Sequence, residues 1–225
     1  RNQAQGELAR QDELILSVAL AASSMPALAS ALDGVPGPTL QEVALPFLGS
    51  VRRGAGLTAL DMEVFDRQGK PRLHSGTDSG QGIGPSLATR ALSGKSPVLG
   101  LDLTGTEPLI KAAAPVLRGD AVLGATVFSM PLASALRNLA LSPEFGVAIL
   151  APQADGSWSV LAERGAVPAD SASRLASSSG PVRATGNLFA LAAPLAGEGA
   201  AARLRLLLTR SEERRVGKEC RSRWS

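Results

Sequence analysis

The sequence contains few of the side chains that usually carry out catalysis or hold a metal ion. It has one histidine, one cysteine and no tyrosine, and aromatic residues make up 3% of the chain. A zinc site of the usual kind needs several histidines or cysteines, so no metal is expected. A Ser-His-Asp triad would combine His74 with Ser75 or Ser79, but these serines lack the nucleophile elbow that such chemistry uses. We therefore expect neither an enzyme nor a bound cofactor.

Charged residues are sparse as well, at 19% of the chain, whereas hydrophobic residues reach 44%, which argues against long disorder. The segment Arg210–Ser225 holds six basic and three acidic residues, and without it 17 charges of each sign remain. This segment resembles the translation of a common sequencing adapter, so we exclude it from the fold as a non-native tail. Taken at face value it would be a basic nucleic-acid arm. No basic patch with interleaved aromatics lies elsewhere, and no nucleic-acid partner is expected.

The single cysteine, Cys220, lies in this tail, so the remaining chain has no disulfide, which suits an exported protein without requiring one. The chain begins without a methionine or a signal peptide. We expect it to be a fragment of a longer protein.

The first fifty residues are predicted to be helical. Between Gln3 and Leu32 the apolar residues recur mostly every three or four positions, which predicts an amphipathic helix about 45 Å long. Pro26 should kink it or begin a new turn. The competing interpretation is a membrane span, since residues 14–32 carry no charge, but alanine, serine and proline dilute this window. Thr39 should cap a second helix that runs to about Arg53, with Glu42 completing a capping box.

The next part of the chain predicts a small sheet. Two strands flank the turn at Asp66–Lys70, and a short helix ends at Gly94. Three antiparallel strands follow, because turn-forming clusters separate three apolar runs: Val98–Leu103, Leu109–Leu117 and Ala121–Met130. The order of strand, strand, helix and three strands is that of a PAS-like sensor sheet.

After a connecting helix at 131–141, the same order of elements begins again at Phe145. It comprises strands at 145–151 and 158–162, a helix near 168–176, and strands at 181–184, 187–195 and 201–209. The letters repeat too, since Ala113-Ala114-Pro115-Val116 and Ala192-Ala193-Pro194-Leu195 both precede a glycine-bearing hairpin. Two copies of one unit are therefore predicted.

Several short motifs, taken in order, resemble the double Cache sensor domains of bacterial chemoreceptors and sensor kinases. They are Arg72-Leu73-His74, Lys95-Ser96-Pro97-Val98 leading into Gly100-Leu101-Asp102, and Ala114-Pro115-Val116 followed by Gly124. The resemblance implies an α+β fold in which a long N-terminal helix packs on two PAS-like modules with antiparallel five-stranded sheets. The expected parts are helices at 1–56, a membrane-distal module at 57–141, a smaller membrane-proximal module at 142–209 and the tail at 210–225.

The resemblance also implies a function. The chain would be the extracytoplasmic ligand-sensing domain of a transmembrane receptor in the inner membrane, facing the periplasm and reporting to a methyl-accepting or kinase domain. Its partners would be a small-molecule ligand, a second copy in a homodimer and, through flanking segments, the membrane. The alternative is a soluble periplasmic binding protein or lipoprotein without signalling output.

The candidate ligand-binding residues lie in the first module. On the first strand Asp61, Glu63 and Phe65 share one face, and the acidic pair either meets solvent or lines a pocket. Lys111 interrupts an apolar strand, where it would face solvent or pair with a ligand carboxylate or with Asp102 on the preceding strand. The family's tyrosines and tryptophan that hold amino acids are missing, which argues against an amino-acid ligand. The predicted binding set is Glu63, Phe65, Arg72, His74, Asp102 and Lys111.

Overall fold

The computed structural model describes residues 2–76, 84–103, 107–139, 145–165, 167, 182–183, 188–194 and 204–211. The chain divides into two compact units, one formed by Ala9–Ser134 and the other by Ala135–Ser225 together with Arg1–Leu8. The predicted helix near 168–176 and most of the adapter-like tail lie outside the described residues. The finer domain boundaries expected from the sequence stay predictions.

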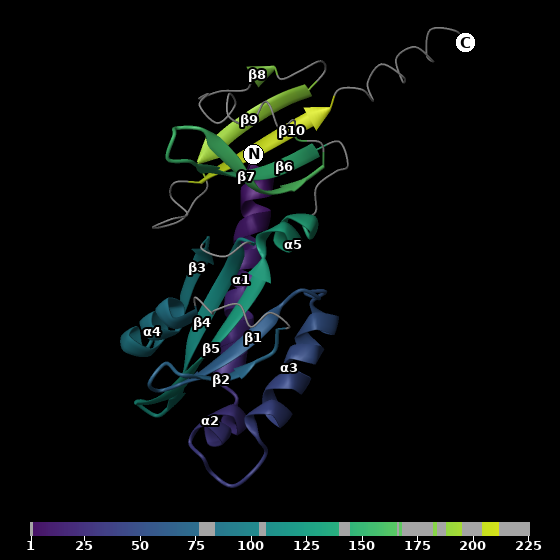
Figure 1. The fold of residues 1–225 in the computed structure, drawn as a ribbon. Coiled ribbons are helices and arrows are strands. Elements are labelled where there is room, and N and C mark those ends of the chain that lie inside the picture. Colours follow the sequence, from purple (N-terminus) through teal and green to yellow (C-terminus); the bar gives the residue numbers. More distant parts are fainter. Residues whose placement is uncertain are drawn as a thin grey trace, which may run out of the picture. The chain divides into compact units, whose positions relative to one another are not determined.

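Three helices open the chain: α1 (Asn2–Ser23), α2 (Pro26–Leu32) and α3 (Leu40–Gly54) (Figure 1). Pro26 begins a new helix, as predicted, and α2 is bent by 65° from α1. With 22 residues, α1 is about 33 Å long, shorter than the 45 Å expected. Among the described helices none alone is long and apolar enough to span a membrane. The bent pair of α1 and α2 together has the length and composition of a span.

The predicted capping box at the start of α3 is confirmed. The backbone N–H of Thr39 donates to Glu42 Oε2 at 2.7 Å, and the N–H of Glu42 donates to Thr39 Oγ1 at 3.2 Å. Two hydrogen bonds to the carboxylate lower the pKa of Glu42 below its usual value: the one from the Thr39 backbone has the larger effect, and the one from the Thr39 hydroxyl the smaller. The sequence therefore determines where this helix begins.

The unit Ala9–Ser134 contains a five-stranded antiparallel sheet, here called sheet A, with the strand order β2-β1-β5-β4-β3. Gly69 and Gly119, with φ of +76° and +57°, form the turns of two of its hairpins. Its elements are β1 (Asp61–Asp66), β2 (Pro71–His74), α4 (Gly84–Gly94), β3 (Val98–Asp102), β4 (Leu109–Arg118) and β5 (Ala121–Pro131).

The second unit repeats this topology in sheet B, whose strand order is β7-β6-β10-β9-β8. Because each strand of sheet B takes the place of its counterpart in sheet A, the predicted repeat is confirmed. The last strand ends at Ser211, two residues into the segment assigned to the tail. Helix α5 (Leu132–Arg137) contains the boundary between the two units. The strands of the second unit are β6 (Phe145–Pro152), β7 (Trp158–Arg164), β8 (Val182–Arg183), β9 (Leu188–Pro194) and β10 (Arg205–Ser211).

Helices cover both faces of sheet A. On one face Thr126 Oγ1 donates to the carbonyl of Ala19 in α1 at 3.3 Å, and Phe128 contacts Phe47 of α3 edge to face. On the other face α4 packs on a core that contains Phe65, Ala113 and Val127. Along β5, alternate side chains therefore face α1 and α3 on one side of the sheet and α4 on the other.

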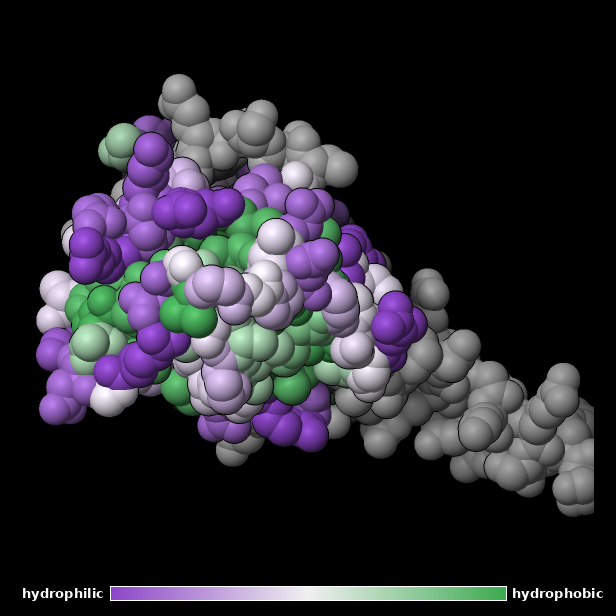
Figure 2. Space-filling model, turned by 90° about the horizontal axis from the view of Figure 1, so that it is seen from below, coloured by the Kyte–Doolittle hydropathy of each residue, from purple (hydrophilic) through white to green (hydrophobic). Residues whose placement is uncertain are grey.

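The large apolar side chains left exposed in this unit are scattered over several elements. Figure 2, a view from the end that carries α2, shows hydrophobic residues dispersed among hydrophilic ones. Dispersed apolar residues are normal on a protein surface and mark no interface by themselves. The exposed residues are Leu20, Val35, Leu45, Leu99 and Leu117.

A partly buried carboxyl group on α1 predicts a pH-dependent stability. Burial, with a smaller contribution from Glu13, raises the pKa of Asp12 from 3.8 to about 6. Between these values the folded protein binds more protons than the unfolded chain, so the free energy of unfolding should fall as pH rises from about 4 to about 6. We expect Asp12→Asn to raise it by about 1–2 kcal/mol at pH 7 and to leave it unchanged at pH 4.

Urea denaturation at the two pH values, followed by circular dichroism, would measure this difference. Asp120→Asn, at an exposed position of the same unit, provides the matched control. An equal effect of Asp12→Asn at pH 4 and pH 7 would contradict the prediction.

Candidate ligand-binding site

The face of sheet A that α4 covers becomes polar beyond the N-terminal end of this helix. Phe65 lies in the core under α4, so by strand alternation Glu63 and Asp61 lie on the same face further along β1. Across the sheet Asp61 pairs with Ser129 of β5, which in turn pairs with Lys111 of β4. The residues therefore form a row of polar side chains across three strands.

Lys111 and Asp102 form a buried ion pair at one side of this row. Lys111 Nζ lies 2.9 Å from Asp102 Oδ2, and the side chains are only 6% and 10% exposed. Directly across the β3–β4 ladder Lys111 faces Gly100, so Asp102 reaches it diagonally. The sequence left open whether Lys111 faces solvent or pairs with an acidic group, and in the structure it pairs with Asp102. Its contact with a ligand stays a prediction.

His74 and Glu63 form a second pair at the other side of the face. The two residues are cross-strand neighbours of β2 and β1, and His74 Nδ1 lies 3.1 Å from Glu63 Oε1. An ionised carboxylate only accepts hydrogen bonds, so Nδ1 carries the proton in this contact. Both residues belong to the predicted binding set, and the structure brings them together.

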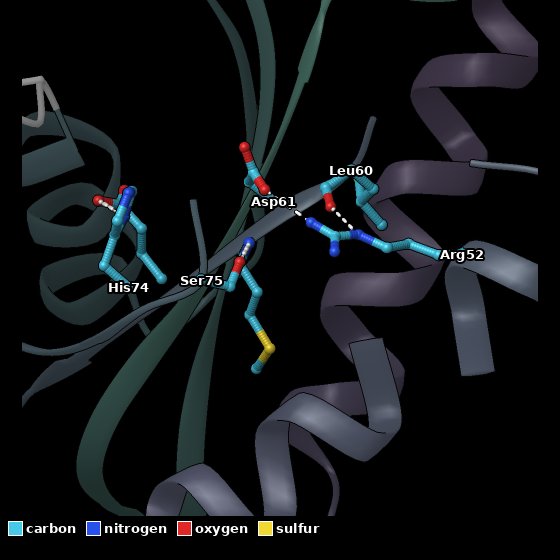
Figure 3. Close-up of polar contacts among 7 residues, drawn as sticks. Arg52, Leu60, Asp61, His74 and Ser75 are labelled. Atoms are coloured by element: carbon cyan, nitrogen blue, oxygen red, sulfur yellow. Dashed lines mark hydrogen bonds and ion pairs between the residues drawn. The ribbon is translucent and has the colours of Figure 1, made fainter. Parts of the chain in front are cut away.

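A third pair, which the sequence did not predict, links the face to α3. Arg52, in the last turn of α3, donates from Nη2 to Asp61 Oδ1 and from Nε to the carbonyl oxygen of Leu60, both at 2.7 Å (Figure 3). Basic residues are common near the C-terminus of a helix, so the position of Arg52 in the sequence does not predict its contact with Asp61. Its partner Asp61 had been expected to face either solvent or the pocket.

The side chains of Asp61 and His74 both lie next to the backbone of Gly76. A Cβ atom at Gly76 would lie 2.8 Å from His74 Nε2 and 3.2 Å from Asp61 Oδ2. The two side chains therefore approach the same point, and the Arg52–Asp61 and His74–Glu63 pairs are neighbours.

The remaining two predicted residues lie apart from these pairs. Phe65 is buried in the α4 core, and Arg72 lies in β2 with Nη1 3.9 Å from Asp66 Oδ2. Phe65 therefore lies on the same face as Glu63 but under α4, and the Arg72 side chain extends toward Asp66. Their roles in binding stay predictions.

The structure gives no support to the Ser75–His74 hydrolase. Ser75 Oγ accepts a hydrogen bond from the N–H of Met62 at 2.8 Å, and in Figure 3 the side chains of Ser75 and His74 lie apart. Within the described part of the chain no three histidine, cysteine or acidic side chains are arranged to hold a metal ion.

Sheet B has no counterpart of the lysine in sheet A. When the repeated Ala-Ala-Pro motifs are superimposed, Ala190 of β9 occupies the position of Lys111 in β4. The neighbouring strand places Thr209 opposite Ala190, as β5 places Ser129 opposite Lys111. Sheet B therefore has the same topology as sheet A but lacks the positive charge of Lys111. This difference favours sheet A over sheet B as the sheet that binds a ligand.

No protein-family model matches the sequence, and neither does any curated protein. Solved structures nevertheless share its fold. The ligand-binding domain of the Campylobacter jejuni chemoreceptor Tlp3 with L-valine is 11% identical, with a TM-score of 0.52 over 94% of this chain and 88% of that one. The sensor domain of the Vibrio cholerae histidine kinase DctB is 14% identical, with a TM-score of 0.51 over 94% and 96%.

A third similar structure is a domain of a putative sensory box/GGDEF family protein from Vibrio parahaemolyticus. It is 14% identical, with a TM-score of 0.57 over 93% of this chain and 92% of that one. The three similarities cover both units, and at these identities they establish the fold. The chain therefore shares their fold, and this two-sheet α+β architecture is the one that the resemblance in the sequence implied.

Proposed function

We propose that this chain is the extracytoplasmic ligand-sensing domain of a bacterial transmembrane signalling receptor of the chemoreceptor or sensor-kinase type. The observation that carries the proposal is the set of three ion pairs on one face of sheet A, in a fold shared with sensor domains. Apolar residues of similar volume would stabilise a sheet at least as well as a buried ion pair. Polar groups on an otherwise apolar surface are typical of a small-molecule site.

Signalling requires that the ligand bind more tightly to one arrangement of the domain than to another. Strand β5 supplies a physical connection, because Ser129 lies on the ligand face and Thr126 on the face that contacts α1. A shift of β5 on ligand binding would therefore act on the Thr126–Ala19 contact. Ligand occupancy would reach the N-terminal helix in this way.

The partners that follow are a small-molecule ligand, a second copy of the chain and the membrane, reached through segments that flank this domain. The domain would lie on the periplasmic side of the inner membrane. No catalytic step, cofactor or nucleic acid enters the proposal. The free-standing binding protein is not favoured, because the similar structures are described as parts of a chemoreceptor, a kinase and a sensory protein.

A thermal-shift screen of small organic acids, amines, amino acids and nucleobases would test the proposal. A ligand at a hundred times its Kd should raise Tm by about 5–10 °C in a chain of this size. Glu63→Gln should remove most of that rise, since it neutralises a carboxylate of the face, and Glu107→Gln, at an exposed position, should keep it.

Failure of every compound class to stabilise the protein would refute ligand sensing. A full shift retained in Glu63→Gln would keep the function and reject this site.

A further inference from the structure

The three ion pairs of the ligand face differ in how accessible they are to solvent. Lys111 and Asp102 are nearly sealed, whereas the side chains of Arg52 and Asp61 are 35% and 39% exposed. An exposed ion pair contributes little net free energy, because water and counterions compete with both partners. Opening the sealed pair would instead strand a buried charge. Within the proposed site, a ligand can therefore replace one partner of the Arg52–Asp61 pair at small cost.

The balance of charge indicates which partner is replaced. The three pairs contain three carboxylates, Asp61, Glu63 and Asp102, but only two permanently charged cations, Arg52 and Lys111. His74 adds a positive charge only when it is protonated. With His74 neutral, these six side chains carry three negative and two positive charges, a balance that favours an additional cation.

We infer that the ligand of this site carries an ammonium, amidinium or guanidinium group, and that this group binds Asp61 in place of the Arg52 guanidinium. In the structure, Arg52 already places a planar cation at 2.7 Å from Asp61 Oδ1, so it occupies the position that the ligand cation would take. Asp61 Oδ2, toward the Gly76 backbone and His74, belongs to the same corner. This inference rests on the proposed function and names its ligand class.

Displacement of Arg52 also supplies a signal. Arg52 holds the last turn of α3 to the start of β1 through Asp61 and the Leu60 carbonyl. A ligand cation on Asp61 removes one of these two bonds, which loosens α3 from the ligand face. Binding and a change at α3 are thereby the same event.

The test compares probes of one shape and different charge by isothermal titration calorimetry on the full chain at pH 8. Benzamidine, benzoate and benzamide form one set, and butylamine, butyrate and butanol form the other. We expect the cations to bind and the anions and neutral compounds to bind much more weakly. The Cε1–H signal of His74 should shift with the cations, and the assignment is unambiguous because the chain has a single histidine.

Two variants give effects of opposite sign. Asp61→Asn should weaken binding of the cation at least about tenfold, because a charge-assisted bond is lost. Arg52→Gln should strengthen it by about two- to fivefold, the range that an exposed ion pair contributes, because the internal competitor is gone. Arg53→Gln, an exposed neighbour on the same helix turn, should leave the affinity unchanged and serves as the matched control.

Weaker or unchanged cation binding in Arg52→Gln would overturn the displacement of Arg52. If only anionic or neutral compounds bind, among these probes and the wider screen, the inference fails while the sensor function stands. If no compound of any class binds, the sensor function fails and this inference fails with it.

Discussion

Lys111→Ala should lower the free energy of unfolding by about 3 kcal/mol, because it leaves the carboxylate of Asp102 buried without the ammonium that lies 2.9 Å away. The loss should exceed that of an ordinary surface substitution by several-fold. Urea denaturation followed by circular dichroism would measure it. Lys70→Ala, at an exposed position of the same unit, is the matched control and should change stability by less than about 1 kcal/mol.

A double variant separates the buried charge from the loss of packing. Lys111→Met with Asp102→Leu removes both charges and keeps most of the volume, so it should recover the stability that the single change loses. The recovered protein should still fail to bind a ligand if the pair shapes the site. A single variant as stable as the wild type would show that Asp102 is not stranded when Lys111 is removed.

Gly124→Ala should destabilise the protein by a similar amount, about 3 kcal/mol, for a steric reason. A Cβ atom at this position would lie 2.2 Å from the carbonyl oxygen of Phe65 and 3.1 Å from Leu32 Cδ1. The first clash is with the backbone of β1 at the last residue pair of the β1–β5 ladder, Asp66 with Gly124, so it cannot be relieved by rotating a side chain. Strand pairing itself has to give way.

The control for this prediction is Gly54→Ala at the end of α3, where a Cβ atom would meet nothing within 4 Å. That change should be neutral or slightly stabilising, because alanine favours a helix and restricts the unfolded chain. Thermal unfolding of both variants would give the comparison. A Tm of Gly124→Ala within a degree of the wild type would mean that the two strands separate at this point without cost.

Local patterns in the sequence predicted most of the elements. The Thr39 and Glu42 spacing located the start of α3, and Pro26 located the break between α1 and α2, because each acts through its own backbone hydrogen bonds. The connecting helix was predicted too long, since Pro131 is the last residue of β5 and α5 ends at Arg137. Local signals predict where elements exist better than where they end.

The candidate site was predicted only in part. Strand alternation placed Glu63 with Asp61 and marked Lys111 as an unusual cation in an apolar strand. It did not connect Arg52 to Asp61, because these residues come from a helix end and a strand start whose approach depends on packing. The structure places Arg72 of β2 near Asp66, and its role in binding stays a prediction.

By itself the sequence determined the order of the elements, their repetition and the parity of each strand, because these depend on the spacing of apolar and turn-forming residues along the chain. Only the tertiary structure decided which charges neutralise one another. The register of β3 against β4 brings Asp102 to Lys111, and the packing of α3 brings Arg52 to Asp61. An ion pair depends on distances of a few ångströms between residues far apart in the chain, and such distances exist only once the sheet and its helices have assembled.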